Sequence, residues 1–75
     1  MADKTLDVKG LNCPMPILRA KKMLKELPRG SVLEVLATDP GSVEDFPAFC
    51  KMTGAELLES TADNGVYRFL IKNGG

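Results

Sequence analysis

The chain has 75 residues and a mass of 8.1 kDa, which is enough for one domain with one small core. Ten lysines and arginines balance ten aspartates and glutamates, and this zero net charge argues against a general nucleic-acid-binding protein. No apolar run approaches the length of a membrane span, and residues 1–4 contain no signal-peptide core. We therefore expect a cytoplasmic protein without a membrane segment.

The absence of histidine narrows the chemistry further, because Ser-His-Asp and Cys-His catalysis within one chain both require it. Two cysteines without histidine cannot complete a four-ligand zinc site unless two chains share one, and we expect neither a metal nor a cofactor. A structural disulfide is also not favoured in a reducing compartment. Thiol chemistry, carboxylate chemistry and plain binding remain.

Alternating polar and apolar residues predict a first strand over residues 5–9, ended by Gly10. From Ile17 the apolar residues recur at helical spacing with basic residues opposite, which predicts an amphipathic helix. Asn12 is its expected N-cap, with Pro14 or Pro16 in the first turn, and Pro28-Arg29-Gly30 ends it. The β-branched, apolar run Val32–Ala37 predicts a buried second strand and completes a βαβ unit.

A second helix follows Asp39-Pro40-Gly41 and ends at Gly54. One face of it carries Val43, Phe46, Phe49 and Cys50. Ser42 and Asp45 resemble a capping box, but a proline in a helix interior clashes with an earlier carbonyl. Because of Pro47 we expect the regular helix to start only near Asp45 or Phe46.

The last third of the chain is predicted to form a β-hairpin. Strands over residues 55–62 and 66–72 flank the turn Asp63-Asn64-Gly65, and residues 72–75 form a short tail that we expect to be mobile. The predicted fold class is therefore an α/β two-layer sandwich of order βαβαββ, in one domain spanning residues 1–75. Its four-stranded mixed sheet carries both helices on one face.

The stretch Gly10–Pro16 places the thiol of Cys13 where a strand ends and a helix begins. Free N–H groups and the positive end of the helix dipole favour an anion there, so we expect a lowered thiol pKa and a role as nucleophile or sulfur acceptor. Pro14 and Pro16 stiffen the turn around the sulfur. The competing interpretation of Cys13 is a small, buried apolar residue at a helix start.

Neighbouring residues refine this hypothesis. A dithiol redox motif would need a cysteine at position 16, and Pro16 stands there instead. Met15, between the two prolines, is expected at the exposed rim, whereas Met23 is expected in the core. Cys50 shares a helix face with apolar residues, so we predict it to be buried and inert, with a resolving role as the less favoured alternative.

These motifs resemble the TusA/SirA family of small sulfur-carrier proteins over nearly the whole chain. The resemblance rests on Cys13-Pro14-Met15-Pro16 within the frame of Leu6-Asp7, Gly10-Leu11, Pro28-Arg29-Gly30, Asp39-Pro40, Asp45–Cys50 and Tyr67–Gly75. It implies a βαβαββ fold and a persulfide carried on Cys13, positioned by Asn12, Pro14, Met15 and Pro16. It also implies sulfur received from a cysteine desulfurase or rhodanese and passed to a DsrE-type or TusD-type acceptor. The pathways implied are tRNA thiolation, molybdenum-cofactor synthesis and sulfur oxidation.

Other readings stay open beside the sulfur carrier. The chain could be an interaction or regulatory module in which Cys13 is structural, or a ubiquitin-like carrier that uses the terminal Gly74-Gly75. RNA binding is the weakest reading, because a fold alone does not confer function. The basic face of the first helix is predicted to dock acidic partner surfaces through Arg19, Lys22 and Lys25.

Overall fold

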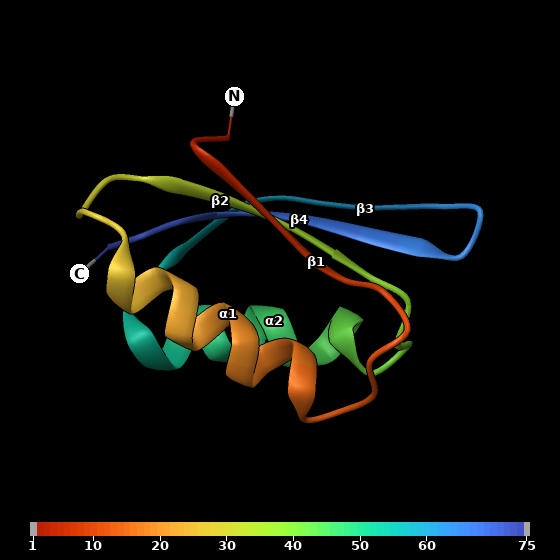
Figure 1. Ribbon diagram of the computed structural model, residues 1–75. Helices are drawn as coiled ribbons and strands as arrows, with labels where there is room; N and C mark the ends of the chain where they lie inside the picture. The colour runs from red at the N-terminus through yellow and green to blue at the C-terminus, as the bar shows by residue number, and fades with distance from the viewer. Residues whose placement is uncertain (1, 75) are drawn as a thin grey trace.

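The computed structural model describes residues 2–74 as six elements in the order β-α-β-α-β-β (Figure 1). They are β1 (Lys4–Val8), α1 (Met15–Glu26), β2 (Val32–Ala37), α2 (Ser42–Thr53), β3 (Glu56–Asp63) and β4 (Val66–Lys72). The four strands form one sheet in the order β1-β2-β4-β3, with β1 and β2 parallel and the other pairs antiparallel. The predicted mixed sheet is therefore confirmed.

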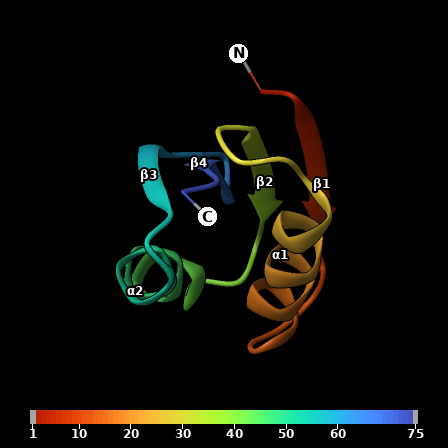
Figure 2. The ribbon, with the colours of Figure 1, turned by 90° about the vertical axis from the view of Figure 1, so that its left-hand side faces the viewer.

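Both helices lie on one face of the sheet, as predicted (Figure 1). Figure 2 shows α1 beneath β1 and β2, and α2 beneath β3 and β4, so that the two helices run side by side. Because both connections return in the same direction, the N-terminal ends of α1 and α2 lie at the same end of the molecule (Figure 1). This parallel arrangement brings the start of each helix into one neighbourhood.

The core lies between the sheet and the helices. Alternate residues of the central strands face inward and are fully buried: Leu33, Val35 and Ala37 in β2, and Phe69 and Ile71 in β4. Phe46 of α2 stacks on Phe69 with ring centroids 4.7 Å apart, which fastens α2 to the sheet. Among described residues, no helix is long and apolar enough to cross a membrane.

The start of α1 differs from the prediction that Asn12 is the N-cap. The helix begins at Met15, its N-cap is Pro14, and no side chain caps it. The backbone carbonyl of Asn12 instead accepts a hydrogen bond from the Met15 N–H at 2.9 Å. Pro16 occupies the second helical position and is buried, so proline does lie in the first turn as expected. The Cys13–Pro14 peptide bond is cis.

The prediction that α2 starts near Asp45 or Phe46 is wrong, because α2 runs from Ser42 through Pro47 to Thr53. Carbonyls of residues 39–41 accept hydrogen bonds from the N–H groups of residues 42–45, and these bonds hold the first turn without help from Pro47. Burial of Phe46 and Cys50 against the sheet then outweighs the one hydrogen bond that a proline removes.

Two further expectations for α2 are corrected. Ser42 caps nothing, since its Oγ is buried without a hydrogen-bond partner among the described residues, and the N-cap position belongs to Gly41. Val43 does not share the core face of Phe46 and Cys50, because its side chain is 46% exposed.

The predicted hairpin is confirmed, with Asn64 and Gly65 both in the left-handed region at φ 51° and 79°. The tail differs from the mobile segment that the sequence predicts. Lys72 belongs to β4, and the Asn73 side-chain amide donates to the carbonyls of Leu24 at 2.9 Å and Leu27 at 3.0 Å. Asn73 thereby joins the end of β4 to the last turn of α1, while residue 75 lies outside the described residues.

Candidate functional site

The two cysteines lie in opposite environments. Cys13 is exposed in the turn before α1, whereas Cys50 is 4% exposed in the core face of α2. Burial raises the pKa of the Cys50 thiol, which disfavours the reactive thiolate. The predicted burial of Cys50 is confirmed, and the alternative in which Cys13 is a buried apolar residue is wrong.

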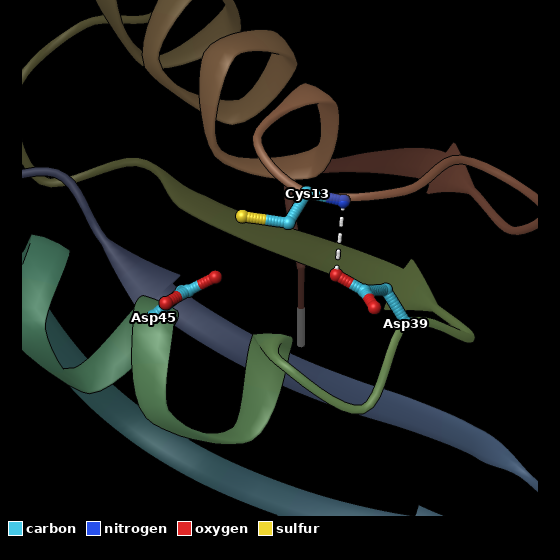
Figure 3. Close-up of side chains that lie close together, drawn as sticks. All are labelled: Cys13, Asp39 and Asp45. Carbon is cyan, nitrogen blue, oxygen red and sulfur yellow. Dashed lines mark hydrogen bonds between the residues drawn. The ribbon is translucent and has the colours of Figure 1, made fainter.

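Two aspartates from the second half of the chain lie beside Cys13. Asp39, in the loop after β2, accepts a hydrogen bond from the Cys13 backbone N–H at 3.0 Å through Oδ2. Asp45, in α2, extends its carboxylate toward the Cys13 sulfur from the other side (Figure 3). The sulfur and one carboxylate oxygen of each aspartate lie within 4.8 Å of one another.

These carboxylates reverse the predicted electrostatics of the thiol. A hydrogen bond to the Asp45 carboxylate raises the pKa of Cys13 above its ordinary value of 9.0, and the negative charges of Asp45 and Asp39 raise it further. The expected lowering by the helix terminus is therefore wrong. Pro14 and Pro16 have no N–H to offer, and the Met15 N–H already binds the Asn12 carbonyl. The sulfur instead faces α2 (Figure 3).

An apolar groove of about 410 Å³ opens between α1 and α2 with Cys13 in its lining. Its other lining residues are Pro14, Ile17, Leu18, Lys21, Asp45, Ala48, Phe49, Met52 and Thr53. Two of these apolar side chains are unusually accessible, Leu18 at 51% and Met52 at 86%. A second cavity of about 380 Å³ shares Lys21, Phe49 and Thr53, so the groove continues along the helices toward Asn73.

The structure separates the residues that the sequence assigned to the site. Pro14 lines the groove with Cys13, and Pro16 is buried beneath the turn. Asn12 and Met15 are exposed beside the thiol segment, as expected for Met15 at the rim. The expected position of Met23 is also confirmed, since it is partly buried and packs against the core.

The basic residues of α1 do not form one face around the thiol. Arg19 and Lys22 border a separate shallow cavity of about 240 Å³ beside Leu6, and Lys25 borders the far end of the groove. Lys21, which the sequence did not single out, is the basic residue in the lining of the groove beside Cys13. A docking role of Arg19, Lys22 and Lys25 remains a prediction.

Sequence reasoning also missed Asp39, Asp45, Leu18 and Met52. In the sequence, Asp39 belongs to a predicted turn and Asp45 to a predicted helix start. They lie 26 and 32 residues after Cys13, so nothing local indicates that they contact it. Leu18 and Met52 could have been found from the sequence, because each is a large apolar residue outside the buried face of its helix, a pattern typical of a binding surface.

Cys13, Asp39 and Asp45 are also the residues that could hold a metal ion, since a thiolate and two carboxylates are ligands that Zn²⁺ accepts. Three protein ligands would leave one tetrahedral position open, so this group is not a closed structural zinc site. The exposed thiol with a groove beside it matches chemistry on the sulfur better than metal storage.

The fold and the site together define a small two-layer α/β protein that presents one accessible thiol at an apolar groove. The family model described as Sulfurtransferase TusA matches residues 4–73, and the chain belongs to this family. It is 61% identical over 70 residues to the sulfur carrier protein TusA of Allochromatium vinosum, covering 93% of this chain and 92% of that protein.

Two further comparisons agree with this assignment. The sulfur carrier protein TusA of Pseudomonas entomophila is 46% identical over 70 residues, covering 93% of this chain and 88% of that protein. The crystal structure of a SirA-like protein from Desulfitobacterium hafniense superposes with a TM-score of 0.83 at 35% identity, over 96% of this chain and 99% of that one. The predicted family and the predicted fold are both confirmed.

Proposed function

We propose that this chain is a sulfur-relay carrier that accepts sulfur as a persulfide on Cys13 and passes it to an acceptor protein. One observation carries the proposal: of the two cysteines, one is exposed beside an apolar groove and the other is buried in the core. The names of the relatives from Allochromatium vinosum and Pseudomonas entomophila, both sulfur carrier proteins, support it.

The transfer requires no cofactor in this proposal. Cys13 attacks the outer sulfur of a donor persulfide, a new S–S bond forms on Cys13, and the donor's own S–S bond breaks to release the donor thiol. Delivery repeats the same exchange with an acceptor thiol as the nucleophile. Both exchanges need a thiol that a second protein can reach, and the accessible Leu18 and Met52 offer that protein an apolar contact beside the sulfur.

A sulfur carrier acts between a donor and an acceptor. For the donor we propose a cysteine desulfurase or a rhodanese, and for the acceptor a DsrE-type or TusD-type protein, within the cytoplasm. The sulfur would then serve tRNA thiolation, molybdenum-cofactor synthesis or sulfur oxidation. The motif Cys13-Pro14-Met15-Pro16 and the family membership support these partner classes.

The proposal is tested by placing serine at each cysteine in turn. Cys13→Ser, Cys50→Ser and the unmodified chain are each incubated with a persulfide donor, and intact mass is recorded. We expect the unmodified chain and Cys50→Ser to gain the mass of one sulfur atom, and Cys13→Ser to gain none. Sulfur acquired by a folded Cys13→Ser protein would overturn the proposal.

The ubiquitin-like alternative, in which the terminal glycine carboxylate carries sulfur, has less support. The chain opens β-α-β, whereas that class opens with a hairpin before its first helix. Gly74 also packs so closely on the Gly54 carbonyl that a side chain at position 74 would collide with it. Deleting residues 74 and 75 should leave sulfur loading on Cys13 intact, and loss of loading in a folded truncated protein would favour the carboxylate.

A further inference from the structure

The proton of the Cys13 thiol must leave before its sulfur can attack a donor persulfide. In many thiol enzymes a histidine takes this proton, but this chain contains none. A proton acceptor built into the site must therefore come from another residue type. Carboxylate oxygens are the acceptors that the structure places near the sulfur.

Two carboxylates lie beside the thiol and one lysine lines the groove that opens next to it, each from a different element. Lys21 of α1 lies in the groove lining, but an ammonium group has only donors to offer. Asp39, in the loop between β2 and α2, directs Oδ2 to the Cys13 backbone N–H at 3.0 Å. Asp45 of α2 points its carboxylate at the sulfur itself (Figure 3). Of these three groups, Asp45 is the one placed to receive the thiol proton.

We propose that Asp45 is a catalytic residue of sulfur loading, which binds the Cys13 thiol in the unloaded carrier and accepts its proton as Cys13 attacks the donor. This inference rests on the function proposed above. It assigns to α2 a part in the chemistry, whereas the thiol itself belongs to the turn before α1.

The step balances without an oxidant or a reductant. The S–H bond of Cys13 breaks as its proton moves to a carboxylate oxygen of Asp45, and the sulfur electron pair forms a bond to the outer sulfur of the donor persulfide. The donor S–S bond breaks, and its electron pair leaves on the donor sulfur. That thiolate then takes the proton from Asp45, so a persulfide and a thiol yield a persulfide and a thiol.

The same carboxylate explains why a proton acceptor is needed during the attack. Hydrogen bonding to Asp45 raises the pKa of Cys13, so the unloaded carrier holds its thiol protonated at neutral pH. Cys13 is exposed, and a preformed thiolate there would react with electrophiles in solution. Proton transfer to Asp45 confines reactivity to the moment when a donor persulfide is in place.

The test compares Asp45→Asn with the matched variant Glu44→Gln, which removes the same charge from an exposed neighbour in α2 that does not line the groove. Glutathione persulfide is the donor, because a small donor avoids effects of the lost charge on protein docking. Loading is followed by intact mass across a pH series. Iodoacetamide alkylation over the same series reports the thiolate fraction of each protein, with Cys13→Ser as the blank for Cys50.

We expect Asp45→Asn to be alkylated faster than the unmodified chain at neutral pH, and yet to load sulfur more slowly for each thiolate present. Loss of a general base predicts a fall of about 10²-fold or more in that normalised rate. At pH values above the thiol pKa the two proteins should load equally, since no proton then remains to be moved. Glu44→Gln should keep the normalised rate, and Asp45→Glu should restore part of it.

Two results would overturn the proposal. One is a loading rate that follows the thiolate fraction identically in the unmodified chain and in Asp45→Asn at every pH, because Asp45 would then only suppress ionisation. The other is an equal loss in Glu44→Gln, which would show a general effect of negative charge. Either outcome leaves the carrier function intact, whereas sulfur loading by a folded Cys13→Ser protein would remove the carrier function as well.

Discussion

The ionisation of the Cys13 thiol is governed by side chains that are remote in sequence. Pro14 and Pro16 at the start of the following helix have no N–H to donate to the sulfur. Asp39 and Asp45 approach Cys13 from the β2–α2 segment (Figure 3). Two negative groups at this range favour the neutral thiol over the thiolate. The unloaded carrier is therefore expected to be a slow nucleophile toward simple electrophiles.

This environment predicts the pH dependence of thiol alkylation. Because the carboxylates raise the pKa of Cys13, the midpoint of the iodoacetamide rate against pH should lie above 9.0 at low ionic strength. Added salt screens charges at an exposed site, so the midpoint should move toward 9.0 as ionic strength rises. Alkylation of Cys13→Ser corrects for Cys50. A midpoint below the ordinary value would show that the helix terminus governs the thiol after all.

At the scale of the elements, the end of β4 is tied to the end of α1 by Asn73. Its side-chain amide donates to the Leu24 and Leu27 carbonyls, and its backbone N–H and carbonyl pair with Ser31 and Gly30 at 2.8 Å each. Carbonyls in the last turn of a helix lack the usual partner one turn further along. Asn73 donates to the Leu27 carbonyl and adds a second donor to the Leu24 carbonyl, which also accepts from the Leu27 N–H at 3.3 Å. The groove between the helices ends at this residue.

Asn73→Ala should therefore lower the free energy of unfolding by about 1–3 kcal/mol, the usual effect of leaving partly buried polar groups without partners. Urea denaturation followed by circular dichroism measures it. Lys72→Ala is the matched control, because Lys72 is an exposed neighbour at the end of the same strand. Equal unfolding free energies for Asn73→Ala and the unmodified chain would remove this role from Asn73.

The outer face of the sheet carries a polar network across all four strands. Arg68 of β4 bridges Glu34 of β2 and Glu59 of β3, and Thr5 of β1 donates to Glu34 at 2.9 Å. The hydrogen bond from Arg68 lowers the pKa of Glu34, and the one from Thr5 lowers it further. This network links the central strands on the face that no helix covers.

The lowered pKa of Glu34 makes part of the stability depend on pH. Because the folded state favours the ionised form of Glu34, ionisation of this residue stabilises the fold. This stabilisation is present above the ordinary pKa of 4.5 and is lost as the pH falls through the lower pKa of the folded state. Below pH 4.5 the free energy of unfolding should thus decline more steeply in the unmodified chain than in Glu34→Gln. Urea midpoints at several acid pH values test this, and parallel declines would contradict it.

On the scale of the whole molecule, the parallel helices build a surface that neither helix has alone. The groove joins Cys13 at one end to apolar side chains from both helices, and Lys21 is the cation in its wall. Arg19 and Lys22 lie beyond α1, near Leu6. A partner seated over the sulfur would meet Lys21 before it met the residues that the sequence assigns to docking.

Charge reversal should separate these positions. We expect Lys21→Glu to slow sulfur transfer between this carrier and a cysteine desulfurase several-fold more than Lys22→Glu, which changes the same charge on the next residue of α1. Loading from glutathione persulfide should be less affected, since a small donor needs no docking surface. Stopped reactions resolved by intact mass give the rates. A greater effect at Lys22 would return docking to the face formed by Arg19, Lys22 and Lys25.

Much of the fold could be predicted because its signals are local. The β-branched, apolar run Val32–Ala37, the helical spacing from Ile17 and the Asn64-Gly65 turn are each features of a few neighbouring residues, and all three predictions are confirmed. The start of α2 could not be predicted in the same way. Pro47 indicates a break, and only the burial of Phe46 and Cys50 on the sheet decides that the helix continues through it.

The features of the site also divide into those that local sequence predicts and those that depend on tertiary contacts. The sequence by itself determined that Cys13 stands at the start of a helix just before the constraining Pro14 and Pro16, that Cys50 lies on an apolar face, and that no histidine can assist either. Only the tertiary structure decided that Asp39 and Asp45 lie beside the thiol, and so decided the direction of its pKa shift. The physical reason is that electrostatic interactions depend on distance in space, and the two βα connections bring the starts of both helices together from distant parts of the chain.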